Sequence, residues 1–204
     1  MSGSSALPEG IRSLDVARGF WERVHTVSPL IVVGTKEHDG YDLAPKHLAG
    51  PLSWEGHYGF VCAGHHATYR NAKAHGGFTV SFPRPDQVVL ASLAAAPREG
   101  WESDKPILEG LPTFTGSVVD APLLMDAYLF LECELDRIVD GFGANSLIAG
   151  RVVAAHAHED ALVASDEPVA ESILKSPLLA YIDPGRYASI EKTHVFPFPE
   201  GFRR

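Results

Sequence analysis

The stretch AYLFLECELDRIVDGFGANSLIAGRVVAAHAH, residues 127–158, decides the fold. Its first half alternates two sets of side chains, which are Tyr128, Phe130, Glu132 and Glu134 against Leu129, Leu131, Cys133 and Leu135. Because successive side chains of a strand point to opposite faces, this pattern predicts a long strand with one wetter face. DGFGAN supplies a turn, and residues 146–158 supply a partner strand. We therefore expect an antiparallel hairpin.

Further strands are expected on the N-terminal side of this hairpin. LIVVGT (residues 30–35) is a β-branched apolar run that ends at the turn-forming KEHDGYD, and strands also fit Tyr58–Ala63 and Gly76–Pro83. About six strands with few helices, and no alternation of strand and helix, favour an antiparallel barrel over a parallel doubly wound sheet. The predicted fold class is mainly β.

Four helices are expected. Apolar residues at steps of three and four over Ile11–Val24 indicate an amphipathic helix. ATYRNAKAH (residues 67–75) carries Thr68 as a candidate N-cap and is followed by Gly76. DQVVLASLAAA (86–96), with Asp86 as a cap, and DEPVAESILKS (166–176) complete the set. The turn-rich stretch 97–114 is expected to be a loop.

The composition is typical of an ordinary compact protein. The 204 residues, 45% hydrophobic and 21% charged, suit one domain. A formal net charge of −9 argues against a broad phosphate-binding surface for nucleic acid. The first residues lack a leader pattern, and no apolar run is long enough to span a membrane, so we expect a cytoplasmic protein. Cys62 and Cys133 are expected to be buried free thiols.

Common catalytic motifs do not occur in the sequence: G-x-S-x-G, H-E-x-x-H, a P-loop and C-x-x-C are all missing. Ten histidines raise the possibility of a metal site, and His156 and His158 would share one face of a strand. A third and fourth ligand cannot be placed, so we predict no metal. A histidine-based metal enzyme is kept as an alternative.

The richest polar cluster joins YDLAPKHLAG (residues 41–50) to HHATYRNAK (65–73). The start of the predicted helix carries His66, Thr68 and Arg70, which together with free backbone N–H groups could hold an anion. Lys46 and His47 could add donors to the same pocket. The alternative interpretation is a capped helix with exposed side chains beside a solvated loop.

Four stretches, in order, resemble the flavin-reductase-like FMN-binding split barrels, the family of flavoredoxins and small flavin reductases. SPLIVVGTKEHDGYDLAPKHLAGPLSWEGHYGFVCAG (28–64) resembles the opening strand, the loop with a polar-x-Ala-Pro element, and the next strand. HHATYRNAKAHGGFTVSFP (65–83) resembles the Thr-x-x-Asn helix and the strand after it. Residues 129–162 resemble the late hairpin with its Gly-x-Val, and SPLLAYIDPGRYASIEK (176–192) resembles the closing stretch that ends in Gly-x-Tyr.

The resemblance implies a Greek-key split barrel over residues 28–204 behind an N-terminal arm, residues 1–27. It implies FMN, with FAD as the alternative, at the interface of a homodimer, and an oxidoreductase that takes electrons from NAD(P)H. A flavoredoxin-like electron carrier without turnover of its own is the alternative. A monooxygenase or an electron-transfer protein is a possible partner. No catalytic acid or base is assigned, because the flavin ring carries the chemistry.

By position, the resemblance places the ring and ribityl chain beside Asp42, Ala44, Lys46, His47 and Ala49. It places the phosphate near His66, Thr68 and Asn71, with Arg70 or Lys46 as the charge partner, and brings Tyr187 toward the flavin. The chain departs from the family at two points. Lys46, His47 and Ala49 stand where many reductases have serines, and Asn145 stands where they have a histidine, five residues before Gly150.

Overall fold

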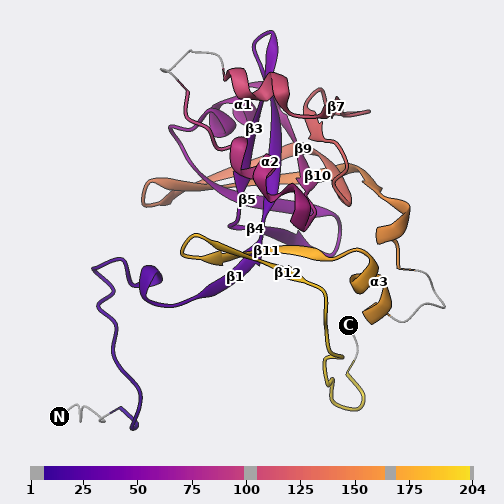
Figure 1. Ribbon diagram of the computed structural model, residues 1–204. Coiled ribbons are helices and arrows are strands. Elements are labelled where there is room, and N and C mark those ends of the chain that lie inside the picture. Colours follow the sequence, from indigo (N-terminus) through magenta and orange to yellow (C-terminus); the bar gives the residue numbers. More distant parts are fainter. Residues whose placement is uncertain (1–6, 99–104, 164–168, 203–204) are drawn as a thin grey trace.

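The computed structural model describes residues 7–98, 105–163 and 169–202. A seven-stranded antiparallel sheet in the order β3-β2-β6-β9-β10-β5-β4 forms the main body (Figure 1). Its strands are β2 (Ile31–Glu37), β3 (Gly40–Lys46), β4 (Ala49–Ser53), β5 (His57–Ala63), β6 (Gly77–Phe82), β9 (Leu129–Phe142) and β10 (Asn145–Ala157). The strands β5 and β6 follow each other along the chain but lie apart in the sheet, which is the crossing that a Greek key requires. The predicted mainly-β fold is confirmed.

The hairpin β9–β10 is the longest pair in the molecule and forms as the alternation predicted. Ile148 lies opposite Ile138, and His156 lies opposite Phe130. The expected wetter face of β9 nevertheless carries a fully buried carboxylate. Glu132 is 0% exposed and accepts hydrogen bonds from the backbone N–H groups of Ser117, Val118 and Val119. Neighbours distant in sequence therefore decide the environment of this face.

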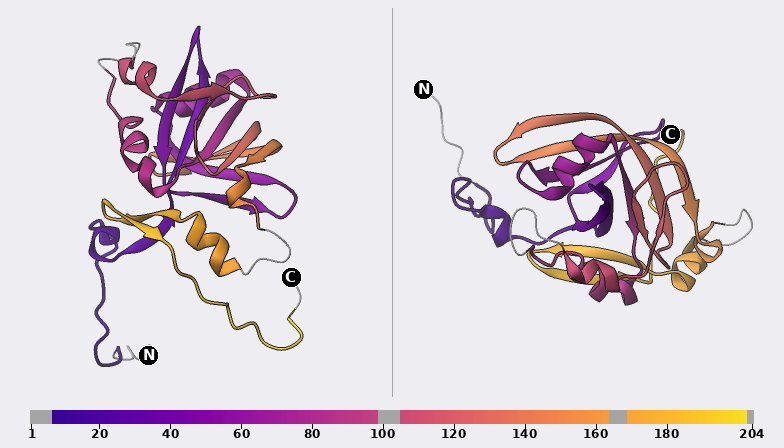
Figure 2. Two further views of the ribbon diagram at one scale, coloured as in Figure 1. Left: turned by 45° about the vertical axis from the view of Figure 1, so that its right-hand side comes forward. Right: turned by 90° about the horizontal axis from the view of Figure 1, so that it is seen from above.

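The sheet curls around the helix α1 (Ala67–His75), and the core lies between them (Figure 2). Ala72 of α1 is fully buried among Phe60, Phe78 and Ile148. Gly150 stands where a side chain would collide with this core, because an added Cβ would lie 2.7 Å from the Phe78 ring. Close packing therefore accounts for the glycine of the late hairpin.

A smaller three-stranded sheet lies beside the main body in the order β1-β11-β12, with β1 (Thr26–Pro29), β11 (Leu178–Asp183) and β12 (Arg186–Ile190). The helix α3 (Val169–Lys175) immediately precedes β11, and the last described residues run away from the body (Figure 1). The strands β7 (Thr113–Thr115) and β8 (Pro122–Leu124) form a third, two-stranded sheet. The remaining helices are η1 (Phe20–Arg23), η2 (Pro85–Gln87), α2 (Val88–Leu93), η3 (Pro106–Gly110) and η4 (Glu159–Ala161).

The helix predicted over Ile11–Val24 is wrong. Only the short 3-10 helix η1 forms there, and Gly19 before it has a left-handed backbone with φ 48°. Ile11 and Trp21 are 56% and 58% exposed, so the apolar stripe does not pack against the described part of the chain. A short helix in water depends on such packing, because its intrinsic propensity alone is marginal.

Three local expectations also differ from the structure. Most of residues 41–50, expected as a loop, belong to β3 and β4. Thr68 is 2% exposed inside α1, and His66 occupies the N-cap position without a side-chain cap bond. Gln87, not Asp86, accepts the capping bond from the Arg84 N–H at η2. The expected helices α2 and α3 do form, although residues 166–168 of the second lie outside the described residues.

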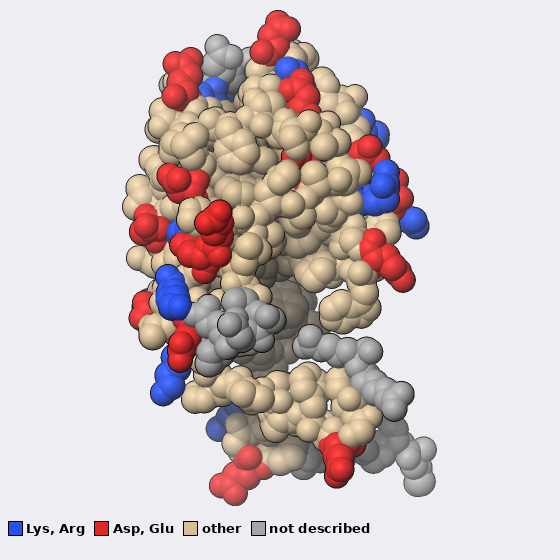
Figure 3. All heavy atoms as spheres, turned by 90° about the vertical axis from the view of Figure 1, so that its right-hand side faces the viewer, with Lys and Arg blue, Asp and Glu red and all other residues tan. Residues whose placement is uncertain are grey.

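The surface shown in Figure 3 carries Lys and Arg side chains interspersed with Asp and Glu rather than gathered into a basic patch. Within the described ranges, none of the helices combines the length and the apolar character needed to cross a membrane.

Candidate functional site

Strand β3 and helix α1 bring the two predicted polar stretches together. Asp42, Ala44 and Lys46 are every second residue of β3 and so share one face of the strand. Thr35 of β2 lies directly opposite Asp42 in the register. The Asn71 side chain of α1 donates a hydrogen bond from Nδ2 to Thr35 Oγ1 at 3.2 Å. The helix is thereby fixed against β2, the neighbour of the strand that carries Lys46.

Nitrogen-bearing side chains gather where β5 ends and α1 begins. His66 Nδ1 lies 3.7 Å from the Cys62 Sγ, and the Arg70 guanidinium donates to the His65 carbonyl. Burial, followed by the positive charges of Lys46, His65 and Arg70, lowers the pKa of His66. This shift favours the neutral imidazole, so Lys46 and Arg70 are the cations of this group. The first N–H groups of a helix, which have no partner within it, point to the same place.

The closing segment of the chain reaches this region through an aromatic contact. His47, just after β3, stacks on Tyr181 of β11 with ring centroids 4.4 Å apart. Tyr181 pairs across the strands with Tyr187, which is 56% exposed. Burial lowers the pKa of His47, although the nearby Asp183 opposes the shift. The smaller sheet thus lies against the end of β3.

Asp42 has ion-pair partners that the sequence did not reveal. Its Oδ1 lies 3.0 Å from Arg98 Nη2 and 3.5 Å from Lys105 Nζ, and the residue is 3% exposed. Lys105 also donates to the carbonyls of Leu43 and Ala94. No sequence motif identifies Arg98 or Lys105 as a partner of Asp42. The only indication was the general rule that a buried carboxylate needs a counter-ion. The Asp42 side chain is thus held by these two residues.

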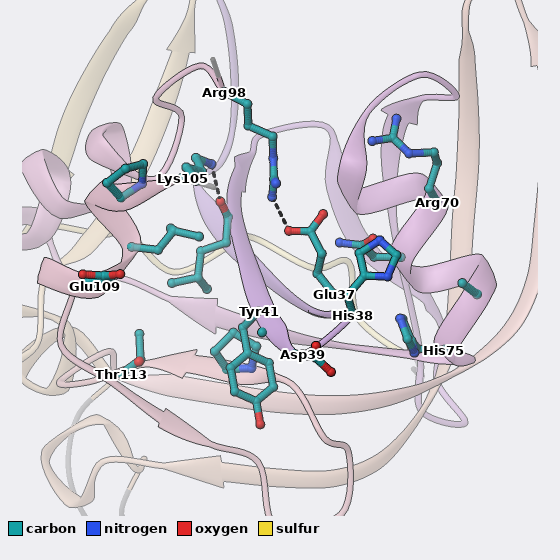
Figure 4. Close-up of a pocket in the computed structure, with 17 residues that line it drawn as sticks. Glu37, His38, Asp39, Tyr41, Arg70, His75, Arg98, Lys105, Glu109 and Thr113 are labelled. Carbon is teal, nitrogen blue, oxygen red and sulfur yellow. Dashed lines mark hydrogen bonds and ion pairs between the residues drawn. The ribbon is translucent and has the colours of Figure 1, made fainter. Parts of the chain in front are cut away.

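A cavity of about 1070 Å³ lies beside α1, between the β2–β3 hairpin and η3 (Figure 4). Of the residues predicted for the site, Arg70 and Asn71 line it. Its other lining residues include Glu37, His38, Asp39, Tyr41, His75, Arg98, Lys105, Glu109 and Thr113. Asp42, Ala44, Lys46, His47, Ala49, His66, Thr68 and Tyr187 do not line it. Two of the ten predicted site residues therefore line the cavity.

The two histidines weighed as metal ligands have separate partners. His156 Nε2 lies 3.2 Å from Glu132 Oε1, and His158 Nδ1 lies 2.9 Å from Asp160 Oδ1. Among the described residues, no three histidine, cysteine, aspartate or glutamate side chains converge as a metal site.

The sequence profile described as "Flavin reductase like domain" matches residues 23–191. The chain belongs to this flavin reductase-like family. Solved structures share the fold. An FMN-binding protein from Thermus thermophilus, solved with bound p-hydroxybenzaldehyde, is 26% identical with a TM-score of 0.73, and the match covers 93% of this chain and 100% of that one.

Two further structures of the flavin reductase-like fold are less similar in sequence. A flavoredoxin from Methanosarcina acetivorans has a TM-score of 0.75 at 19% identity, with 94% of this chain and 98% of that chain covered. The NADH:FAD oxidoreductase SgcE6 from Streptomyces globisporus C-1027 has a TM-score of 0.66 at 17% identity, with coverage of 85% and 90%. Comparison with curated protein sequences found no match.

Proposed function

We propose that this chain is a flavin-dependent oxidoreductase that binds FMN along β3 and at the start of α1. The observation that carries the proposal is the convergence of Lys46, His66 and Arg70 at the first turn of α1. Two cations, a neutral imidazole and free backbone N–H groups form a donor set that suits a phosphate. The family and the FMN-binding relative from Thermus thermophilus support the choice of ligand.

Each residue of the proposed site has a distinct task. Lys46 and Arg70 neutralise the phosphate, and the uncharged His66 donates or accepts one hydrogen bond. Asn71, bonded to Thr35, fixes α1 against β2, which pairs with β3. The backbone from Ala44 to Ala49 borders the ring, with His47 held in place by Tyr181. When bound, the flavin supplies hydride and electron transfer, so no acid or base of the chain is required for that step.

The active form in this proposal is a homodimer of the split-barrel domain, residues 28–204, with the arm of residues 1–27 extending from it. The flavin lies at the interface, where Tyr187 approaches it, and takes electrons from NAD(P)H. The acceptor is a second flavin or another small molecule, with a monooxygenase or an electron-transfer protein as a possible partner. We place the protein in the cytoplasm.

Two measurements test the proposal. Titration of FMN with the purified protein is expected to give saturable quenching of the flavin fluorescence. A colourless preparation without such quenching would overturn the proposed ligand. Stopped-flow mixing of the loaded protein with NADH and with NADPH is then expected to bleach the flavin band, which tests the electron donor.

An electron carrier without turnover of its own is the second candidate, and Asn145 favours it. Asn145 lies opposite Ala63 at the end of β5, and the adjacent Gly64 N–H donates to the Ala144 carbonyl. An amide that cannot titrate thus stands beside the proposed flavin site, where family reductases have an imidazole. If neither nicotinamide donor bleaches the bound flavin, but dithionite does, the carrier assignment replaces the reductase.

A further inference from the structure

Arg84 lies where the end of β6 meets three segments that are distant in the sequence. Its side chain is 17% exposed, and each of its three nitrogen atoms donates a hydrogen bond. Nη1 donates to Ser176 Oγ at 2.8 Å, Nη2 to Asp160 Oδ1 at 2.7 Å, and Nε to the Asp126 carbonyl at 3.2 Å. One planar group thus joins the main sheet to the chain before β9, after β10 and before β11.

The bond to Ser176 ties this junction to the smaller sheet, which lies below the main body in Figure 1. Ser176 is 4% exposed and directly follows α3, with its N–H bonded to the Ser172 carbonyl. The strand β11 begins two residues later, and its Leu179 and Ala180 are 6% and 4% exposed. Because hydrogen bonds from a charged donor are shorter and stronger than those between neutral groups, Arg84 fixes the position at which β11 begins.

The strand β11 connects this fixed point to the proposed flavin site. Tyr181 follows Ser176 by five residues, a reach of up to about 17 Å in an extended chain. Its ring stacks on His47 at a centroid distance of 4.4 Å, and it lies opposite Tyr187 of β12. A shift at Ser176 would therefore move both tyrosines of the smaller sheet relative to His47.

The surroundings of Arg84 argue against a ligand site of its own. A pocket of about 420 Å³ lies beside it, and Asp86, Asp126, Asp160 and His158 are among its lining residues. The hydrogen bond from Arg84 is the main cause that lowers the pKa of Asp160, which favours the charged form of this counter-ion. An anion would meet carboxylates here, and the guanidinium is already bonded within the chain. Arg84 therefore acts on the geometry of the chain itself.

We propose that Arg84 is a positioning residue for the flavin ring, because it holds β11 so that Tyr181 stays stacked on His47. The inference rests on the proposed function, which places His47 at the border of the ring. Arg84 acts at the ring end of that site, whereas Lys46 acts at the phosphate end. Loss of Arg84 should therefore weaken FMN and riboflavin alike, since both carry the ring.

A double-mutant cycle on the full chain tests the inference. Arg84→Met, Tyr181→Leu and the double variant are titrated with FMN and with riboflavin, and binding is followed by flavin fluorescence. We expect each single substitution to raise both dissociation constants about fivefold, and the double substitution to raise them no further, because Arg84 acts through Tyr181. Single effects that multiply in the double variant, or wild-type affinity in Arg84→Met, would overturn the inference and leave the flavin site intact. Absence of binding of both flavins by the wild type would remove the proposed function as well.

The spectrum of the bound flavin separates positioning from stability. At saturating FMN, the visible absorption band reports the surroundings of the ring, so we expect its shape to differ between Arg84→Met and the wild type. A purely structural role would lower the urea midpoint and leave this band unchanged, which would contradict the proposal. Arg151→Met, which removes an exposed ion pair with Glu134, is the matched control and should keep both affinities within about twofold.

Two smaller substitutions replace Arg84→Met if circular dichroism shows that it does not fold. Ser176→Ala removes the bond that leads to β11, whereas Asp160→Asn alters the bond to η4 and leaves the bond to Ser176 in place. We expect Ser176→Ala to reproduce the loss for both flavins and Asp160→Asn to bind them like the wild type. A loss in Asp160→Asn as large as in Ser176→Ala, or no loss in either, would overturn the proposal.

Discussion

At the scale of single residues, Lys46 is the side chain whose charge the proposed phosphate site most needs. Lys46→Met keeps the apolar stem and removes the ammonium. Because a hydrogen bond to a charged group contributes about 1.5–3 kcal/mol, we expect the Kd for FMN to rise at least tenfold. Riboflavin, which lacks the phosphate, should bind both proteins equally. Lys73→Met, on the exposed side of α1, is the matched control. A comparable loss for riboflavin would show that Lys46 does not act on the phosphate.

Glu132 has a structural role that urea denaturation can measure. Its Oε1 accepts hydrogen bonds from the Ser117 N–H and hydroxyl, and its Oε2 accepts bonds from the N–H groups of Val118 and Val119. In Glu132→Gln, the amide NH₂ would face donors instead of accepting from them. We expect the free energy of unfolding to fall by about 2–3 kcal/mol, measured by urea denaturation. An unchanged midpoint would mean that the carboxylate does not anchor residues 117–119.

The same carboxylate predicts a pH dependence. Burial raises the pKa of Glu132, but the hydrogen bonds from Val119, Ser117 and Val118 outweigh burial and lower the pKa to about 2. Since the folded pKa lies below the unfolded value, the stabilisation is complete above about pH 4.5 and is lost as the pH falls toward 2. Urea midpoints measured between pH 6 and pH 3 should fall less steeply in Glu132→Gln than in the wild type. Parallel curves would contradict the assignment.

At the scale of elements, the close approach of β2 to the start of β8 requires Gly34. An added Cβ would lie 2.0 Å from the Pro122 carbonyl oxygen and 2.5 Å from Thr79 Oγ1. Gly34→Ala is expected to destabilise the protein by about 3 kcal/mol or more, because backbone cannot move aside cheaply. Gly50→Ala in β4, where a Cβ meets nothing within 4 Å, is the matched control and should change stability little. Thermal unfolding measures both, and equal midpoints would refute the packing argument.

Elements with a local pattern were predictable from the sequence, and contacts between distant elements were not. The alternation in 127–135 and the turn at 140–145 predicted β9–β10, because both follow from the backbone of a hairpin. The helix over Ile11–Val24 failed because periodicity records amphipathicity without supplying a surface to bury it. The ion pairs of Asp42 with Arg98 and Lys105 escaped prediction, since they join segments more than 50 residues apart with no motif to mark them.

The same distinction between local patterns and distant contacts applies to the candidate site. Its phosphate end could be anticipated, because the start of a helix offers N–H groups wherever the helix lies, and His66 and Arg70 lie at that start. The cavity lined by Tyr41, Glu109 and Thr113 depends on how the β2–β3 hairpin meets η3. Only the tertiary arrangement brings those residues together. The family resemblance supplied the link between β3 and α1. In the structure, the Asn71–Thr35 hydrogen bond joins α1 to β2, which pairs with β3.

At the scale of the whole molecule, both ends of the described chain expose large apolar side chains. Trp21 in the N-terminal arm is 58% exposed, and Phe196, Phe198 and Phe202 in the C-terminal segment are 67%, 46% and 54% exposed. Figure 2 shows both segments extending away from the sheets. Concentrated apolar exposure of this kind marks an interaction surface, and the proposed homodimer would cover it with a second copy.

A triple substitution of the C-terminal aromatics tests this arrangement. Phe196→Ser, Phe198→Ser and Phe202→Ser together are expected to shift the protein from dimer to monomer in sedimentation velocity experiments. Because the proposed flavin lies at the interface, the same protein should also lose flavin affinity by tenfold or more, about 1.4 kcal/mol. The control replaces three comparably exposed residues outside the two arms, Val89, Val118 and Val163, by serine and should remain dimeric. A dimer that survives the aromatic substitutions would place the interface elsewhere, and a monomer that binds flavin normally would separate the flavin site from it.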